Sequence, residues 1–140
     1  MSLLFTLEIA PKPQVRHRTI HGGRRTYDPS SKYKNQIKEM ARMVAPAEPV
    51  EGALRVTMSF YLAMPKAFGK RKQDLAIQGQ VRPFKRPDLS NYIKAVEDAL
   101  DGIIWRDDGQ IVEYGPRTGK YFSEFPRIEV MVETLNVDLY

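Results

Sequence analysis

Residues 86–110 of the 140-residue chain read RPDLSNYIKAVEDALDGIIWRDDGQ, and this stretch decides most of what the sequence indicates. Pro87 and Gly102 bound a predicted helix at Asp88–Leu100 within this stretch. At about 100° per residue, one side of this helix is apolar and holds Leu89, Ile93, Val96 and Leu100. The opposite side is polar and holds Asn91, Lys94, Asp98 and Asp101. The apolar side is expected to pack on a core, which leaves the polar side for solvent or a ligand.

Two acidic residues follow this helix. Asp107 and Asp108 stand just before a strand predicted at Gln110–Tyr114. A turn after the helix would fold the strand back beside it, so we expect Asp88 and Asp108 to converge. Mg²⁺ takes carboxylate oxygens as ligands, it polarises a phosphoryl oxygen and activates a bound water, and an ammonium group such as Lys94 stabilises developing charge. The pattern predicts a candidate acidic metal site.

Each of these residues also has an ordinary structural use. Asp88 is well placed to be a helix N-cap. An Asp-Gly pair such as Asp108-Gly109 commonly forms a turn, and Lys94 with Asp98 is an i,i+4 pair typical of a solvated face. Trp105 is more simply a core or interface residue than a platform for a DNA base. Taken alone, the residues predict no more than a candidate acidic site in a basic protein.

The rest of the chain predicts an α+β fold: a small mixed sheet with helices packed on it, in a single domain over residues 1–140. Strands are predicted at Leu3–Ile9, Ala53–Met64, Gln110–Tyr114 and Arg127–Glu133, with an irregular connection at Pro116–Phe125. Other predicted elements are a basic hairpin at Gln14–Tyr27, a helix that starts at Asp28 and ends before Pro46, and a short helix near Gly69–Ala76.

Composition excludes several classes of protein. The length fits one domain, and 42% hydrophobic residues allow a modest core. The absence of cysteine excludes disulfides, zinc–thiolate sites and thiol nucleophiles. No run of about 18 apolar residues is present, so no membrane contact is expected. The N-terminus lacks the basic region of a signal peptide, and we expect a cytoplasmic protein.

The charge is distributed unevenly. Residues 1–86 hold 17 Lys and Arg against 6 Asp and Glu, whereas residues 87–140 hold 5 against 11. This asymmetry fits a surface that attracts a polyanion to a cluster of carboxylates, although a basic protein with an acidic face is the plainer interpretation. The cations of the hairpin and of residues 65–86 fit either the phosphates of a polyanion or a solvated charged surface. These cations are Arg16, Arg18, Arg24, Arg25, Lys66, Lys70, Arg71, Lys72, Arg82, Lys85 and Arg86.

Residues 86–114 resemble the signature of the RusA family of crossover junction endodeoxyribonucleases. That signature is Pro/Arg-Asp-x-Asp-Asn, a following Lys-Ala, then Asp-Ala-Leu, then Asp-Asp-x-Gln-Ile/Val, and its two halves occur here at the expected separation. The N-terminal strand and the hairpin before Tyr27 extend the resemblance more weakly. It implies a RusA-like fold and a Mg²⁺-dependent homodimer, with Mn²⁺ expected to substitute, that resolves four-way (Holliday) junctions in branched double-stranded DNA. Genes of this family are commonly carried by prophages.

By position, the resemblance also implies roles for single residues. Asp88 corresponds to the first metal carboxylate, Asp108 to a third acidic catalytic position with Asp107 beside it, and Lys94 to the catalytic lysine. We therefore expect Asp88, Asp107 and Asp108 to hold the metal. The positions that support the motif are Ser90, Asn91 and Asp98.

One of these supporting positions departs from the family. Ser90 stands where the family has its second aspartate, and a hydroxyl is a weak, uncharged Mg²⁺ ligand. We expect activity to survive, with Asp107 or a bridging water completing the site. Two alternatives stay open: a less selective endonuclease for flaps or forks, and a branched-DNA-binding module that has lost catalysis. A homodimer would supply the two sites that paired cuts in a two-fold junction need.

Overall fold

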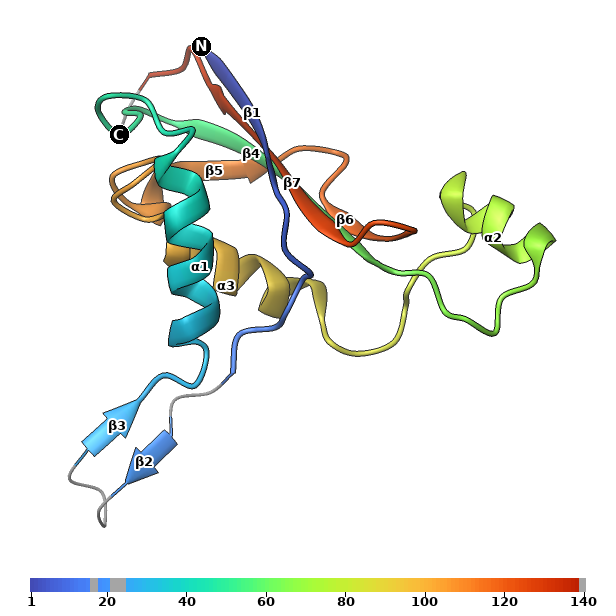
Figure 1. Ribbon diagram of the computed structural model, residues 1–140. Coiled ribbons are helices and arrows are strands. Elements are labelled where there is room, and N and C mark those ends of the chain that lie inside the picture. Colours follow the sequence, from blue (N-terminus) through green and yellow to red (C-terminus); the bar gives the residue numbers. More distant parts are fainter. Residues whose placement is uncertain (16–17, 21–24, 139–140) are drawn as a thin grey trace.

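A five-stranded mixed sheet forms the centre of the molecule in the computed structural model, which describes residues 1–15, 18–20 and 25–138 (Figure 1). β4 (Leu54–Ala63) pairs antiparallel with β7 (Arg127–Thr134), which in turn pairs antiparallel with β1 (Ser2–Leu7). On the other side of β4, β5 (Ile111–Tyr114) and then β6 (Gly119–Ser123) pair parallel with it. The α+β fold is confirmed, and the four predicted strands agree with β1, β4, β5 and β7 to within two residues at each end.

The prediction of an irregular connection at Pro116–Phe125 is wrong, because this segment contains β6. Gly119–Ser123 pair with Ser59–Ala63 of β4. The short run of Tyr and Phe between Gly119 and Pro126 gives little local signal for a strand. Its partner lies about sixty residues earlier in the chain, so pairing with a long central strand decides its structure.

The helices lie in two places (Figure 1). α1 (Ser31–Arg42) and α3 (Leu89–Leu100) pack against each other beside the sheet. α2 (Lys70–Ile77), the predicted short helix, lies beyond the end of β4 and next to β6. The predicted hairpin is confirmed by the antiparallel pair β2 (Arg18–Ile20) and β3 (Arg25–Tyr27), which projects from the start of α1. Arg16 and Arg24 lie outside the described residues.

The core lies between β4 and the two packed helices. Val56, Met58 and Phe60 of β4 are fully buried, and the ring of Phe60 stacks on Tyr92 of α3 with centroids 5.4 Å apart. The predicted apolar side of α3 is confirmed, since Val96 and its apolar neighbours are buried. Because side chains alternate along a strand, Thr57, Ser59 and Tyr61 point to the opposite face of the sheet. That face is therefore largely polar along β4.

The turn between β5 and β6 passes directly against β4 at Gly115. The backbone N–H of Gly115 donates to the carbonyl of Val56 at 3.0 Å. A Cβ at position 115 would lie 1.9 Å from Oγ1 of Thr57, which no real Cβ contact allows. Glycine is therefore required for β5 and β6 to follow one another along the same edge of β4.

The pair of Arg55 and Glu133 on the polar face predicts a pH-dependent stability. These residues are register partners on β4 and β7, and Nε and Nη2 of Arg55 each lie 3.1 Å from a carboxylate oxygen of Glu133. The hydrogen bond from Arg55 lowers the pKa of Glu133 below its ordinary value of 4.5. The stabilisation from a lowered acid pKa is complete above the unfolded-state value, and it is lost as pH falls through the folded-state value.

Replacing Glu133 with glutamine is therefore expected to lower the melting temperature by a few degrees near pH 7. The difference between the wild type and the variant should shrink as the pH falls below about 4. Thermal unfolding followed by circular dichroism between pH 3 and 7 checks this. An equal difference at both ends of that range would show that the ion pair is not its cause.

Candidate active site

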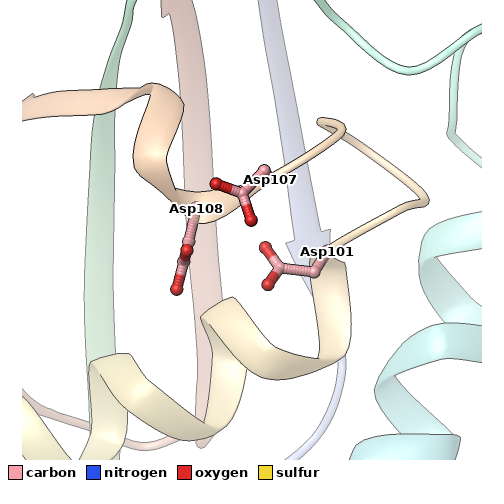
Figure 2. A group of neighbouring side chains, drawn as sticks. All are labelled: Asp101, Asp107 and Asp108. Carbon is pink, nitrogen blue, oxygen red and sulfur yellow. The ribbon is translucent and has the colours of Figure 1, made fainter.

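Three carboxylates come together at the end of α3. Asp101, Asp107 and Asp108 each offer an oxygen, and these oxygens lie within 4.8 Å of one another. Asp101 follows the last residue of α3, and Asp107 and Asp108 begin a 3-10 turn, η1 (Asp108–Gln110), which leads into β5. Figure 2 shows the carboxylates of Asp101 and Asp107 facing each other, with Asp108 beside them above α3. We call these three residues the acidic group.

The turn after α3 fixes Asp101. Gly102 has a φ of +79°, which glycine adopts readily, and its N–H donates to the carbonyl of Trp105 at 2.7 Å. The indole Nε1 of Trp105 donates to Oδ1 of Asp101 at 2.6 Å, and Trp105 is fully buried. The expectation that Trp105 is a core residue is confirmed. Its burial holds one oxygen of Asp101 in place.

η1 orients Asp107 and carries Asp108 as its first residue. Oδ2 of Asp107 accepts a hydrogen bond from the N–H of Gly109 at 2.9 Å, and Oε1 of Gln110 accepts one from the N–H of Asp107 at 3.0 Å. The alternative that Asp107-Asp108-Gly109 forms a turn is therefore correct, with Asp107 as its N-cap. One carboxylate oxygen of Asp107 is used in this cap, so the turn also orients the carboxylate.

The carboxylates of the acidic group and of nearby Glu97 repel one another. Burial raises the pKa of Asp101, and repulsion by Asp108 and Asp107 raises it further, although the hydrogen bond from Trp105 opposes the shift. Burial likewise raises the pKa of Glu97, whose Oε1 accepts a hydrogen bond from the hydroxyl of Tyr114. A divalent cation would relieve this repulsion, and hard oxygen donors suit Mg²⁺. The residues present therefore fit a divalent metal ion.

Lys94 lies on the side of α3 next to this group. Its Nζ contacts Oδ1 of Asp98 at 3.0 Å, and this hydrogen bond, together with the more distant attraction of Asp108, raises its pKa. Lys94 therefore carries its positive charge at neutral pH. The predicted i,i+4 ion pair of Lys94 and Asp98 is confirmed. Asp98 also forms an ion pair with a second cation. Oδ2 of Asp98 lies 3.1 Å from Nζ of the buried Lys34, which also contacts Asp28 at 2.6 Å.

Asp88 is placed at the opposite end of α3. It is the N-cap residue, but its side chain makes no capping hydrogen bond and is exposed. At 1.5 Å per residue, the helix separates Asp88 from Asp101 by about 20 Å along its axis. Asp88 is not part of the acidic group, and its convergence with Asp108 stays a prediction. Ser90 and Asn91 are exposed in the first turn.

Comparison with known proteins agrees with these features. The sequence profile of the family described as "Endodeoxyribonuclease RusA" matches residues 8–133. The chain belongs to the RusA endodeoxyribonuclease family. It is also 34% identical over 130 residues to YqaN of Bacillus subtilis (strain 168), a protein described as uncharacterized; this match covers 90% of the chain and 87% of YqaN. The resemblance carried by residues 86–114 is confirmed. In the described part of this RusA-family chain, no helix is long and apolar enough to cross a membrane.

The structure adds residues to the RusA motif that the sequence did not single out. Asp101 was expected on the polar side of the helix, but it was not expected to join Asp107 and Asp108. An acidic residue at the end of the motif helix, followed by Gly102 and a tryptophan, is the local signal that would have identified it. Glu97 and Lys34 carry no such signal, because their contacts come from β5 and α3 respectively.

The described cations predicted to contact DNA lie in three parts of this RusA-family protein: α2 with the loop before it, the segment just before α3, and the hairpin. α2 carries the exposed Lys70, Arg71 and Lys72, and Lys85 and Arg86 are exposed just before Asp88. Arg18 and Arg25 belong to β2 and β3 of the hairpin. Figure 1 shows α2 and the hairpin at separate corners of the molecule. The contact of these cations with DNA stays a prediction.

Metal binding can be tested on the acidic group directly. Mg²⁺ at about 100 times its Kd is expected to raise the melting temperature by roughly 5–10 °C, because it binds the folded state. Asp101→Asn should reduce this shift at least by half, whereas Asp88→Asn should leave most of it. Differential scanning fluorimetry over a Mg²⁺ titration measures both. A shift lost in Asp88→Asn and kept in Asp101→Asn would instead identify Asp88 as the ligand.

Proposed function

We propose that this RusA-family chain is a Mg²⁺-dependent endodeoxyribonuclease that resolves four-way DNA junctions by paired phosphodiester hydrolysis. The observation that carries the proposal is the acidic group beside Lys94, in a chain whose family is an endodeoxyribonuclease family. Carboxylates and a lysine are the groups that hydrolysis of a phosphodiester needs.

The proposed roles follow from the contacts. Asp101, Asp107 and Asp108 would hold the ion, which when bound supplies Lewis acidity and an activated water. Lys94 places a positive charge where negative charge develops on the phosphate. Asp98, held by Lys34, orients Lys94 at 3.0 Å. Asp88 lies at the other end of α3, outside this group, and the thermal-shift test decides between Asp101 and the metal carboxylate role that the motif position implies for Asp88.

The departure at Ser90 bears on whether the protein cuts DNA at all. The acidic group contains three carboxylates without position 90, and a Mg²⁺ site against a phosphate needs only one or two. This supports an active enzyme over a decayed binding module. We also propose a homodimer, since two incisions placed symmetrically across a four-way junction call for two copies of the site.

Cleavage of defined substrates tests the function. The protein is incubated with a mobile four-way junction, a flap, a fork and a linear duplex, each with Mg²⁺, with Mn²⁺ or with EDTA. We expect paired, symmetric nicks in the junction with either ion and none with EDTA. Equal cutting of flaps and forks would favour the less selective nuclease. Tight junction binding without cutting, even in Mn²⁺, would identify a binding module.

A further inference from the structure

Arginine and tyrosine side chains form a stacked arrangement where β6 meets the polar face of the sheet. The rings of Tyr61 and Tyr121 stack with centroids 5.4 Å apart. The guanidinium of Arg82 lies 3.9 Å from the centroid of Tyr121, and that of Arg127 lies 4.0 Å from the centroid of Tyr61. Arg117 lies 4.9 Å from Tyr121. We call these five residues the arginine–tyrosine column.

Arg82 is held in a fixed position by three features. Its Nε donates to the carbonyl of Lys120 at 2.6 Å, and its guanidinium rests on Tyr121. Gly119 leaves room for it, because a Cβ there would lie 2.8 Å from Nη2 of Arg82. The hydrogen bond to Lys120 uses only Nε, so the two terminal nitrogens keep donors for a ligand.

Arg117 is held from both ends. Its carbonyl accepts hydrogen bonds from the hydroxyls of Tyr121 at 2.8 Å and Ser59 at 2.9 Å, and its Nη2 lies 3.3 Å from the hydroxyl of Tyr61. Side chains that are already ordered lose less entropy when they bind. Arg82 and Arg117 therefore form a prepared pair of cations, no more than about 9 Å apart because both contact the ring of Tyr121.

Among the described residues, the charges of this pair are offset only from a distance, by the attraction of Glu129 for Arg117. Arg127 forms an ion pair with Glu129 at 3.2 Å. Within the described ranges, neither Arg82 nor Arg117 has a carboxylate within ion-pair distance. A cavity of about 240 Å³ opens beside Arg117, between Tyr121 and the end of α2. Arg117 lines this cavity, and Arg82 lines a neighbouring one. Two ordered guanidinium groups without an ion-pair partner in the described residues suit a phosphate, whose oxygens match the donor geometry of arginine.

The column adjoins the N-terminal end of α3. Nζ of Lys120 donates to the carbonyls of Lys85 and Pro87, each at 2.9 Å, and Asp88 follows directly. Arg82 is bonded to the carbonyl of the same Lys120. The column therefore lies near the N-terminal end of α3, whereas the acidic group lies at its other end.

We propose that Arg82 and Arg117 bind the phosphodiester backbone of the DNA substrate away from the phosphate that is cut, on the side of the N-terminal end of α3. This inference rests on the proposed function, because it takes branched DNA as the ligand. The contact is to the backbone, so it positions the DNA without reading its sequence. Neither arginine belongs to the metal site or to the hairpin.

Junction binding in Ca²⁺, where cutting is avoided, tests the inference. Affinity is measured by fluorescence anisotropy at 50–200 mM salt for the wild type and for Arg82→Gln/Arg117→Gln. We expect the double variant to bind at least about tenfold more weakly, and the slope of log K against log salt to fall by about 2, because each phosphate contact contributes about 0.9. The control, Lys38→Gln/Arg42→Gln, removes two cations of α1 and should change neither quantity.

A charge-preserving variant separates binding from folding. Arg82→Lys/Arg117→Lys should keep the salt slope and lose only a few-fold in affinity, since lysine keeps the charge but lacks the planar fork. An unchanged affinity and slope in the glutamine variant would overturn the inference and leave the nuclease proposal standing. A changed oligomeric state with unchanged DNA affinity would also overturn it, by identifying a protein interface. A wild type that neither binds nor cuts junctions would instead remove the proposed function.

Discussion

Replacing Asp108 with asparagine is expected to lower the rate of junction cleavage by at least about 10³-fold, while leaving junction affinity within a few-fold of the wild type. Asp108 lies in the acidic group and is the acid whose charge acts on Lys94 and Glu97. The amide is almost the same size as the carboxylate but has no charge, so it cannot hold a hard cation as well. Single-turnover cleavage and binding in Ca²⁺ measure the two quantities separately.

Asp74 provides the matched control for this experiment. It is an acid on α2 that pairs with Lys70 at 3.1 Å, on a solvent-exposed face. Asp74→Asn makes the same chemical change away from the acidic group and should cut junctions at a rate close to that of the wild type. If Asp108→Asn cut at an undiminished rate, Asp108 would have no part in the chemistry, and the site would have to be sought near Asp88.

Replacing Trp105 with alanine is expected to lower the free energy of unfolding by about 3–5 kcal/mol. Trp105 is the largest fully buried side chain of the described residues, and its loss leaves a cavity beside the end of α3. The variant also leaves Oδ1 of Asp101 without the indole donor. Urea unfolding followed by far-ultraviolet circular dichroism measures the change. Fluorescence is unsuitable, because Trp105 is the only tryptophan of the chain.

Trp105→Phe separates packing from the hydrogen bond. Phenylalanine fills most of the space but donates no hydrogen bond, so the expected loss of stability is only about 1–2 kcal/mol. The Mg²⁺-induced thermal shift should nevertheless be smaller in this variant, since Asp101 is no longer held. A Mg²⁺ response equal to that of the wild type would show that the indole positions nothing in the acidic group.

The elements with strong local patterns could be predicted from the sequence. The apolar alternation of β4 and the apolar side of α3 each specify a buried surface, and the structure buries both. β6 could not be predicted, because its strand character depends on pairing with Ser59–Ala63. The packing of Lys34 between two carboxylates depends in the same way on the contact of α1 with α3.

The candidate site was predictable in part for a similar reason. The spacing of the motif indicates that Asp107, Asp108 and Lys94 belong together. The structure places Asp107 and Asp108 beside the C-terminal end of α3, with Asp108 near enough to raise the pKa of Lys94. Asp101 was missed because its part in the group comes from the turn at Gly102, which brings η1 back over the end of the helix. Helical geometry alone sets the distance that separates Asp88 from this group.

Gly115 has a consequence for how functional screens of this protein are interpreted. Any side chain at that position would collide with Thr57, so β5 and η1, which carries Asp107 and Asp108 at its start, would shift against β4. Random mutagenesis scored by nuclease activity would then find position 115 as intolerant as the acidic positions themselves. Only an assay that also measures folded protein would reveal that this glycine acts through the architecture of the sheet and contributes nothing to hydrolysis.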